Sequence, residues 1–125
     1  THGLGDLYFA IMEGILFNVY HCYRILTEIG GVPEKILISG GIMNSQFWLQ
    51  IAADIFGRDL LTTGVTNDST VGAAIIGLRA AGGLKNGEDF IPVMTKGTPS
   101  PSKNGEVFQE RFQRYLELYR LTSAE

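Results

Sequence analysis

Residues 35–45 read Lys-Ile-Leu-Ile-Ser-Gly-Gly-Ile-Met-Asn-Ser, a short apolar run followed by two glycines and, after two more apolar residues, a polar pair. A continuous apolar run of this length is typical of a strand covered on both faces, as in a parallel sheet. Asn44 or Ser45 can cap a following helix, whose apolar residues keep helical spacing from Phe47 to Phe56. The stretch therefore predicts a strand, a turn and a helix of an α/β protein.

The rest of the sequence predicts a second strand–loop–helix unit and further helices on either side of the two units. A second strand is expected at 59–63, followed by a polar loop and a helix over 70–81. A long proline-free helix over 6–29 precedes both strands, and glycines and prolines mark 82–104 as an irregular segment. An aromatic helix over about 106–121 closes the order of elements. This alternation predicts parallel strands joined by crossover helices.

Two strands are too few for a stable sheet, because their open edges and faces need further cover. The helix over 6–29 is apolar around most of its circumference, and such a helix is normally packed on more than one side. The sequence also opens on Thr1 rather than Met. We therefore expect residues upstream of this chain to supply the rest of the sheet.

Composition narrows the class of protein. The chain has 125 residues, of which 45% are hydrophobic and 18% charged, so we expect one globular domain. Its formal net charge of −3 makes nucleic acid an unexpected partner, since no broad basic surface is available. With Cys22 as the single cysteine and two distant histidines, we expect neither a disulfide nor a His/Cys metal site. No signal segment or apolar run of roughly 18 residues is visible, so we expect a cytoplasmic protein without membrane contact.

Gly40 and Gly41 form the candidate binding turn. They stand at the predicted carboxyl end of a parallel strand, where α/β proteins bind ligands. Glycines let a flat or anionic group touch the backbone, and the following helix start offers free N–H groups. A tight turn with a helix cap explains the same two glycines and stays open as an alternative. The chain contains neither a Walker A pattern nor a Gly-x-Gly-x-x-Gly fingerprint.

The helix predicted over 70–81 is rich in small residues, which permit a close approach to a sheet or to a bound ligand. These residues are Gly72, Ala73, Ala74, Gly77, Ala80 and Ala81. Asp68 and Ser69 are predicted to cap the start of this helix, and the polar loop before it can also face a bound ligand.

Three segments resemble the FGGY carbohydrate kinases, which are ATP-dependent kinases of sugars, polyols and sugar acids with an actin-like (ribonuclease H-like) fold. Residues 6–14 look like the second half of the family's C-terminal signature. The pattern Gly-Gly-x3-Ser-x2-Trp-x-Gln-x2-Ala-Asp over 40–54 resembles the family's adenine-side motif, and its spacing is far more specific than two glycines. Gly-Ala-Ala at 72–74 is similar to a helix start near the nucleotide in that family.

The resemblance implies that residues 1–125 are the C-terminal portion of the ATP-binding domain of such a kinase, with upstream strands and an N-terminal sugar-binding domain elsewhere. ATP would bind with Mg2+ in the cleft between two lobes. Gly40 and Gly41 would lie against the nucleotide, and Ser45 matches a position near the adenine. Asn44 is either a neighbour of that contact or the helix cap.

Other matching residues carry less chemistry. Trp48 lies on the apolar helix face and is expected in the core, while Asp54 is either a buried hydrogen-bond acceptor or faces water. Gln50 matches the motif as well. The catalytic aspartate of the family belongs to its first lobe and matches no position here. We therefore assign no catalytic or metal-binding residue and expect the isolated chain to be inactive, because phosphoryl transfer depends on a complete cleft.

Within the family, the sequence of residues 40–48 resembles gluconate and xylulose kinases and so favours gluconate or xylulose as the substrate. The resemblance implies that the sugar or sugar acid is bound by the N-terminal domain. A homodimer is one expected assembly. Another actin-like ATPase is the first alternative. The second is a non-enzymatic interaction domain, in which the glycine turn is purely structural and apolar helix faces meet a partner.

Overall fold

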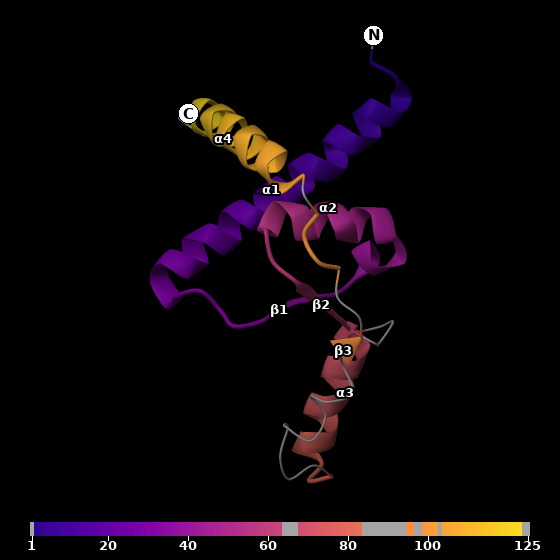
Figure 1. The fold of residues 1–125 in the computed structure, drawn as a ribbon. Helices are drawn as coiled ribbons and strands as arrows, with labels where there is room; N and C mark the ends of the chain where they lie inside the picture. The colour runs from indigo at the N-terminus through magenta and orange to yellow at the C-terminus, as the bar shows by residue number, and fades with distance from the viewer. Residues whose placement is uncertain (1, 64–67, 84–94, 97–98, 103, 124–125) are drawn as a thin grey trace.

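A computed structural model of the chain describes residues 2–63, 68–83, 95–96, 99–102 and 104–123 (Figure 1). Its elements are α1 (Leu4–Gly30), β1 (Ile36–Ile38), the 3-10 turn η1 (Gly41–Asn44), α2 (Gln46–Phe56), β2 (Leu60–Thr63), α3 (Asp68–Ala80), β3 (Thr95–Lys96) and α4 (Gly105–Thr122). Every helix and strand predicted from the sequence is present, with its ends within two residues of the predicted ones. The α/β class is therefore confirmed.

The sheet has the strand order β1-β2-β3. β1 and β2 are parallel, with Ile36 opposite Leu60 and Ile38 opposite Thr62, and α2 is the crossover between them as predicted. β3 runs antiparallel to β2 and lies inside 82–104, which was expected to be irregular. That expectation is wrong at this strand, because a strand of two residues is defined by its partner and has no periodicity of its own.

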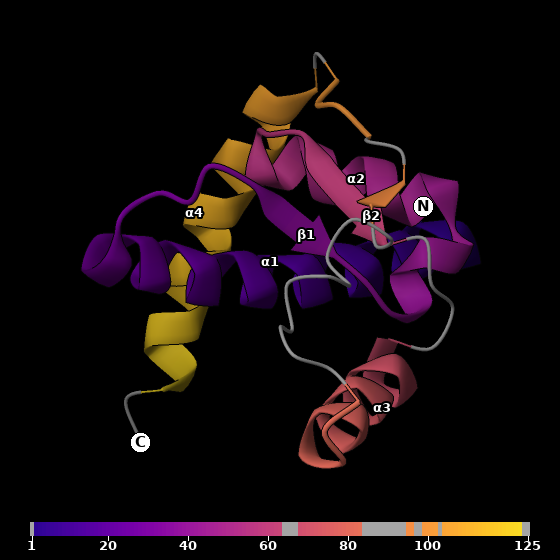
Figure 2. The ribbon, with the colours of Figure 1, turned by 90° about the horizontal axis from the view of Figure 1, so that it is seen from below.

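Three helices lie together on one side of the sheet, and α3 extends away on the other side (Figures 1 and 2). α1 contacts α2, and α4 contacts both of them. None of the helices in the described part of the chain is long and apolar enough to cross a membrane.

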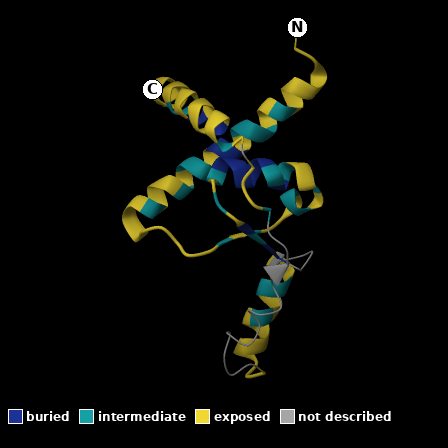
Figure 3. Cartoon of the chain, in the orientation of Figure 1, coloured by how far each residue is buried: buried dark blue, intermediate teal, exposed yellow. Residues whose placement is uncertain are grey.

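The core lies where α1, α2 and α4 meet, and Figure 3 shows its buried residues gathered at that crossing. Its fully or nearly buried apolar members are Leu16, Phe17, Leu49, Ile51, Ala52, Ala53, Ile55, Leu60, Phe108 and Phe112. Aromatic rings join the helices: Phe112 of α4 lies 4.8 Å from Tyr20 and 5.6 Å from Phe17 between ring centroids. Burial, followed by the nearby Tyr119 and Cys22, raises the pKa of Tyr115 above its ordinary 10.0.

α1 packs against the other described helices through one face, and only along part of its length. Leu16 and Phe17 are its buried residues. Its exposed large apolar residues are Leu4, Leu7, Tyr8, Ile11, Ile15, Val19, Ile25, Leu26 and Ile29. The prediction that this helix is packed on more than one side is therefore not met by the described residues of this chain.

α3 also differs from its predicted setting. No residue from Ser69 to Ala80 is buried, and a Cβ added at Gly72 or Gly77 would meet no heavy atom within 4 Å. The close approach expected from its small residues is thus absent among the described residues. Asp68 and Ser69 are the first two residues of the helix rather than its caps, and the residues before them, 64–67, lie outside the described part of the chain.

Candidate functional site

The candidate site is the turn that joins β1 to α2. β1 ends at Ile38, η1 spans Gly41–Asn44, and α2 begins at Gln46. Because β1 and β2 are parallel, their carboxyl ends meet at one edge of the sheet. The turn therefore lies at the edge where α/β proteins bind ligands.

The backbone conformation at residue 40 requires a glycine. Its φ of 90° and ψ of −160° fall in a region that is essentially reserved for glycine. Its carbonyl oxygen accepts a hydrogen bond of 3.0 Å from the N–H of Met43, which starts the 3-10 turn. Glycine at this position is thus explained by the turn itself.

Gly41 has no such explanation. Its φ lies outside the left-handed region, the residue is exposed, and a Cβ added there would meet no heavy atom within 4 Å. Neither backbone strain nor packing within the described residues therefore demands a glycine. A group that comes close to the backbone from outside would demand one.

Ser45 is the N-cap of α2. Its Oγ accepts a hydrogen bond of 3.2 Å from the N–H of Trp48, while its hydroxyl proton stays free to donate elsewhere. Asn44 is the last residue of η1 and is exposed. Of the two residues proposed as the cap, the structure selects Ser45.

Two helix starts follow each other in this turn. The first N–H groups of a helix have no partner within it, so η1 begins with free groups at Gly41 and Ile42, and α2 with free groups at Gln46 and Phe47. At the start of α2 such groups, together with the positive end of the helix dipole, favour an anion. The turn can therefore receive a phosphate or a flat polar group against bare backbone.

Gln50 and Asp54 face away from this turn and hold another segment. The carboxylate of Asp54, which is 4% exposed, accepts hydrogen bonds from the backbone N–H of Ser102 (2.5 Å), the hydroxyl of Ser102 (2.9 Å) and Gln50 Nε2 (3.0 Å). Gln50 Nε2 also donates to the carbonyl oxygen of Ser100 at 2.9 Å. Asp54 is thus a buried acceptor that fastens the segment before α4 to α2.

Trp48 packs against the core, as predicted. Its Nε1–H is buried and has no acceptor among the described residues.

Arg58 was not singled out from the sequence, yet it donates to the carbonyl oxygens of Pro33 (2.7 Å) and Glu34 (3.1 Å) and so fixes the approach to β1. Ser102 donates to the carboxylate of Asp54 and Arg58 donates to backbone carbonyl oxygens, in both cases across a long stretch of sequence, so no local residue pattern predicts these contacts.

Residues 72–74 belong to α3 and are not buried. The polar loop before that helix, which was also expected near a nucleotide, lies at 64–67 outside the described part of the chain. Within the described ranges, no group of three or more His, Cys, Asp or Glu side chains could hold a metal ion.

Comparison with known proteins gives one family. The model of the FGGY family of carbohydrate kinases, C-terminal domain, matches residues 1–81. A xylulose kinase of Staphylococcus epidermidis is 29% identical over 125 residues, which cover 97% of this chain and 25% of that protein. A gluconokinase of Bacillus licheniformis is 36% identical over 111 residues, which cover 88% of this chain and 21% of that protein.

Solved structures agree with these relatives. The xylulose kinase from Rhodospirillum rubrum aligns with a TM-score of 0.81 and 25% identity, over 99% of this chain and 26% of that one. The gluconate kinase from Lactobacillus acidophilus aligns with a TM-score of 0.78 and 25% identity, over 93% of this chain and 24% of that one. The chain therefore spans about a quarter of the length of the proteins it matches.

Proposed function

Because this chain belongs to the FGGY family of carbohydrate kinases, we propose that it is the C-terminal portion of the ATP-binding domain of an ATP-dependent carbohydrate kinase. Such an enzyme transfers the γ-phosphoryl group of ATP to a hydroxyl of a sugar, polyol or sugar acid. We propose gluconate or xylulose as the acceptor, on the support of relatives that are named for these substrates.

The observation that carries the proposal is an exposed, unstrained glycine, Gly41, in the turn at the carboxyl edge of the two parallel strands. Gly40 serves the turn, whereas Gly41 is exposed, unstrained and uncrowded. A nucleotide lying against the backbone accounts for it, and the tight-turn alternative does not. The family match over residues 1–81 includes this turn and supports the same assignment.

In this proposal each residue of the turn has a role. Gly40 and Gly41 present bare backbone to the nucleotide, and the free N–H groups at the starts of η1 and α2 face its polar groups. The hydroxyl of Ser45, held by its capping bond, donates towards the adenine. The exposed side chain of Asn44 lies at the rim of the contact.

Magnesium is proposed to arrive with ATP and to be held by its phosphates and by residues beyond this chain. When bound, it neutralises charge on the phosphates. The described residues contribute no carboxylate cluster for it.

The six large apolar residues that α1 exposes between Leu4 and Val19 support the proposal that more of the same protein packs on this chain. Exposing this many large apolar residues of one helix to water is costly, and a protein about four times longer than this chain offers the missing cover. We therefore propose that the catalytic base and the sugar pocket lie in the other three quarters of the protein. On its own, the 125-residue chain is expected to show no kinase rate, because half a cleft cannot position the two substrates.

Gly41→Val tests the nucleotide contact in the complete protein that carries this chain. We expect ATP affinity by calorimetry to fall by about tenfold or more, which is roughly 1.4 kcal/mol, while the melting temperature without ATP changes little. Gly30→Val is the matched control, since Gly30 is also exposed and uncrowded but lies at the end of α1. Unchanged ATP affinity in Gly41→Val would assign the turn a purely structural role.

Release of ADP with Mg-ATP, measured across gluconate, xylulose, ribulose and glycerol, tests the reaction. A strong signal with gluconate or xylulose is expected. ATP binding without turnover on any acceptor would favour another actin-like ATPase, and a folded protein that binds no ATP would favour an interaction domain.

A homodimer in the cytoplasm is also proposed, and light scattering of the complete protein checks the dimer.

A further inference from the structure

The C-terminal halves of α1 and α4 diverge (Figures 1 and 2). Side chains of both helices line a groove between them. Its volume is about 380 Å3, which lies within the range of roughly 300–1,000 Å3 typical of small-molecule sites. The groove lies on the helical side of the molecule, away from the turn that follows β1, and nothing in the proposed kinase reaction uses it.

The walls of this groove suit a flat apolar group. Phe112, which is 1% exposed, and Leu116 of α4 line it, together with the half-exposed Ile25 of α1. The His21 ring stands edge-on to Tyr119, with ring centroids 5.0 Å apart and an interplanar angle of 88°. Rings held in this way present a rigid aromatic wall to a ligand.

The rim of the groove is cationic. Arg24 of α1 and Arg120 of α4 both line it, and within the described residues neither guanidinium forms a hydrogen bond or an ion pair. Glu28 is the one carboxylate among the lining residues. Two unpaired arginines beside a single carboxylate favour an anion, and guanidinium groups match the planar shape of a carboxylate.

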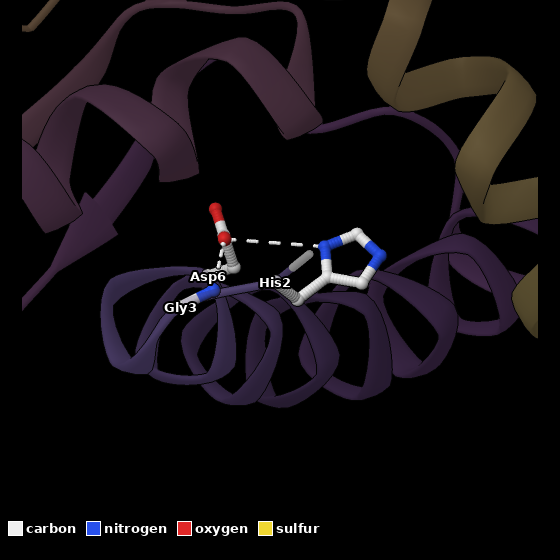
Figure 4. A network of polar contacts seen from close by, with 3 residues as sticks. All are labelled: His2, Gly3 and Asp6. Carbon is white, nitrogen blue, oxygen red and sulfur yellow. Dashed lines mark hydrogen bonds and ion pairs between the residues drawn. The ribbon is translucent and has the colours of Figure 1, made fainter.

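A second hollow, at the N-terminal half of α1, provides the contrast. It is larger, about 750 Å3, but its charged groups already have partners. Arg111 pairs with Glu13 at 2.9 Å. Asp6 accepts a hydrogen bond of 2.8 Å from the N–H of Gly3 and lies 3.9 Å from His2 (Figure 4). That hollow therefore offers no unpaired cation.

We propose that the groove between α1 and α4 binds a small aromatic carboxylate. Its ring lies against Leu116 and Tyr119, and its carboxylate is held by Arg24 and Arg120. The inference is independent of the proposed kinase function, since none of these residues belongs to the turn after β1.

Binding of 2-naphthoate to the complete protein, followed by calorimetry and by NMR of the ligand, tests the proposal. 2-Naphthamide is the matched probe, because it has the same ring and no charge. We expect naphthoate to bind the wild type at least tenfold more tightly than naphthamide does. Equal affinities of the two probes, or no binding of naphthoate, would overturn the proposal.

Variants assign the charge contact. Arg24→Gln combined with Arg120→Gln is expected to weaken naphthoate about tenfold and to leave naphthamide unchanged. Arg114→Gln, on the same helix α4 but outside the groove lining, is the charge-matched control and should leave both probes unchanged. An equal loss in the control, or no loss in the double variant, would show that naphthoate binds elsewhere and would overturn the proposal. All three arginines are exposed, so these variants are expected to fold.

Discussion

The two strand–turn–helix units of this chain follow the same order and have very different surroundings. The first, β1 with α2, carries six buried residues on its helix. The second, β2 with α3, has a buried strand but no buried residue from Ser69 to Ala80. Figure 3 shows the contrast directly, with α2 dark blue and α3 teal and yellow.

The difference lies in what each helix has to pack against. α2 presents large apolar side chains to α1 and α4, which converge on it. α3 presents glycine and alanine, and its larger residues Ile76 and Leu78 are exposed. Helical spacing in a sequence thus identifies an element, while its burial depends on neighbours that the spacing does not name.

The largest effect should come from truncating an apolar residue in each helix. Ile55→Ala, in α2, removes a side chain that is 1% exposed, and we expect the free energy of unfolding to fall by about 2–5 kcal/mol. Ile76→Ala, in α3, removes one that is 72% exposed, and we expect a change within about 0.5 kcal/mol. Denaturant unfolding of the complete protein measures both.

Similar losses in the two variants would contradict this comparison, since they would mean that α3 is as deeply packed as α2 in the complete protein. Leu60→Ala serves as an internal standard for a fully buried position in the neighbouring strand β2.

Local signals explain how much of this fold could be predicted from sequence. Apolar spacing located α2 and α4, the proline-free stretch over 6–29 located α1, and a polar loop followed by small residues located α3. The run at Ile36–Ile38 located β1. The two glycines located the candidate turn, because a positive φ at Gly40 and a capping serine are local requirements. These features depend on residues only a few positions apart, so they can be predicted from the sequence.

Long-range contacts could not be predicted in the same way. β3 exists because Thr95 and Lys96 pair with β2, some 30 residues earlier. The bond between Asp54 and Ser102 spans 48 positions, and it decides between the two settings predicted for Asp54 in favour of the buried hydrogen-bond acceptor. Such partners are chosen by the three-dimensional arrangement, and a single sequence contains no record of that choice.

A smaller effect should separate the two helix starts. Ser45→Ala removes the oxygen that accepts from the N–H of Trp48, and we expect the free energy of unfolding to fall by about 1 kcal/mol. Ser69→Ala lies inside the first turn of α3 and is exposed, so a change within about 0.5 kcal/mol is expected. Thermal unfolding without ATP measures both, so that the nucleotide contact proposed for Ser45 does not enter. An equal loss in both variants would give Ser69 a capping role that its place in the helix does not indicate.

The smallest effect carries the sharpest information about α3. Gly77→Ala should raise the free energy of unfolding by about 0.5–1 kcal/mol, because alanine favours a helix and nothing lies within 4 Å of the added Cβ. The reverse change at an exposed neighbour, Ala73→Gly, should lower it by a similar amount. If Gly77→Ala instead destabilises the complete protein while Ala73→Gly behaves as expected, another part of the protein lies against Gly77. The sign at this one glycine therefore decides whether the small residues of α3 serve close packing, as their pattern predicts, or stay exposed as in the described chain.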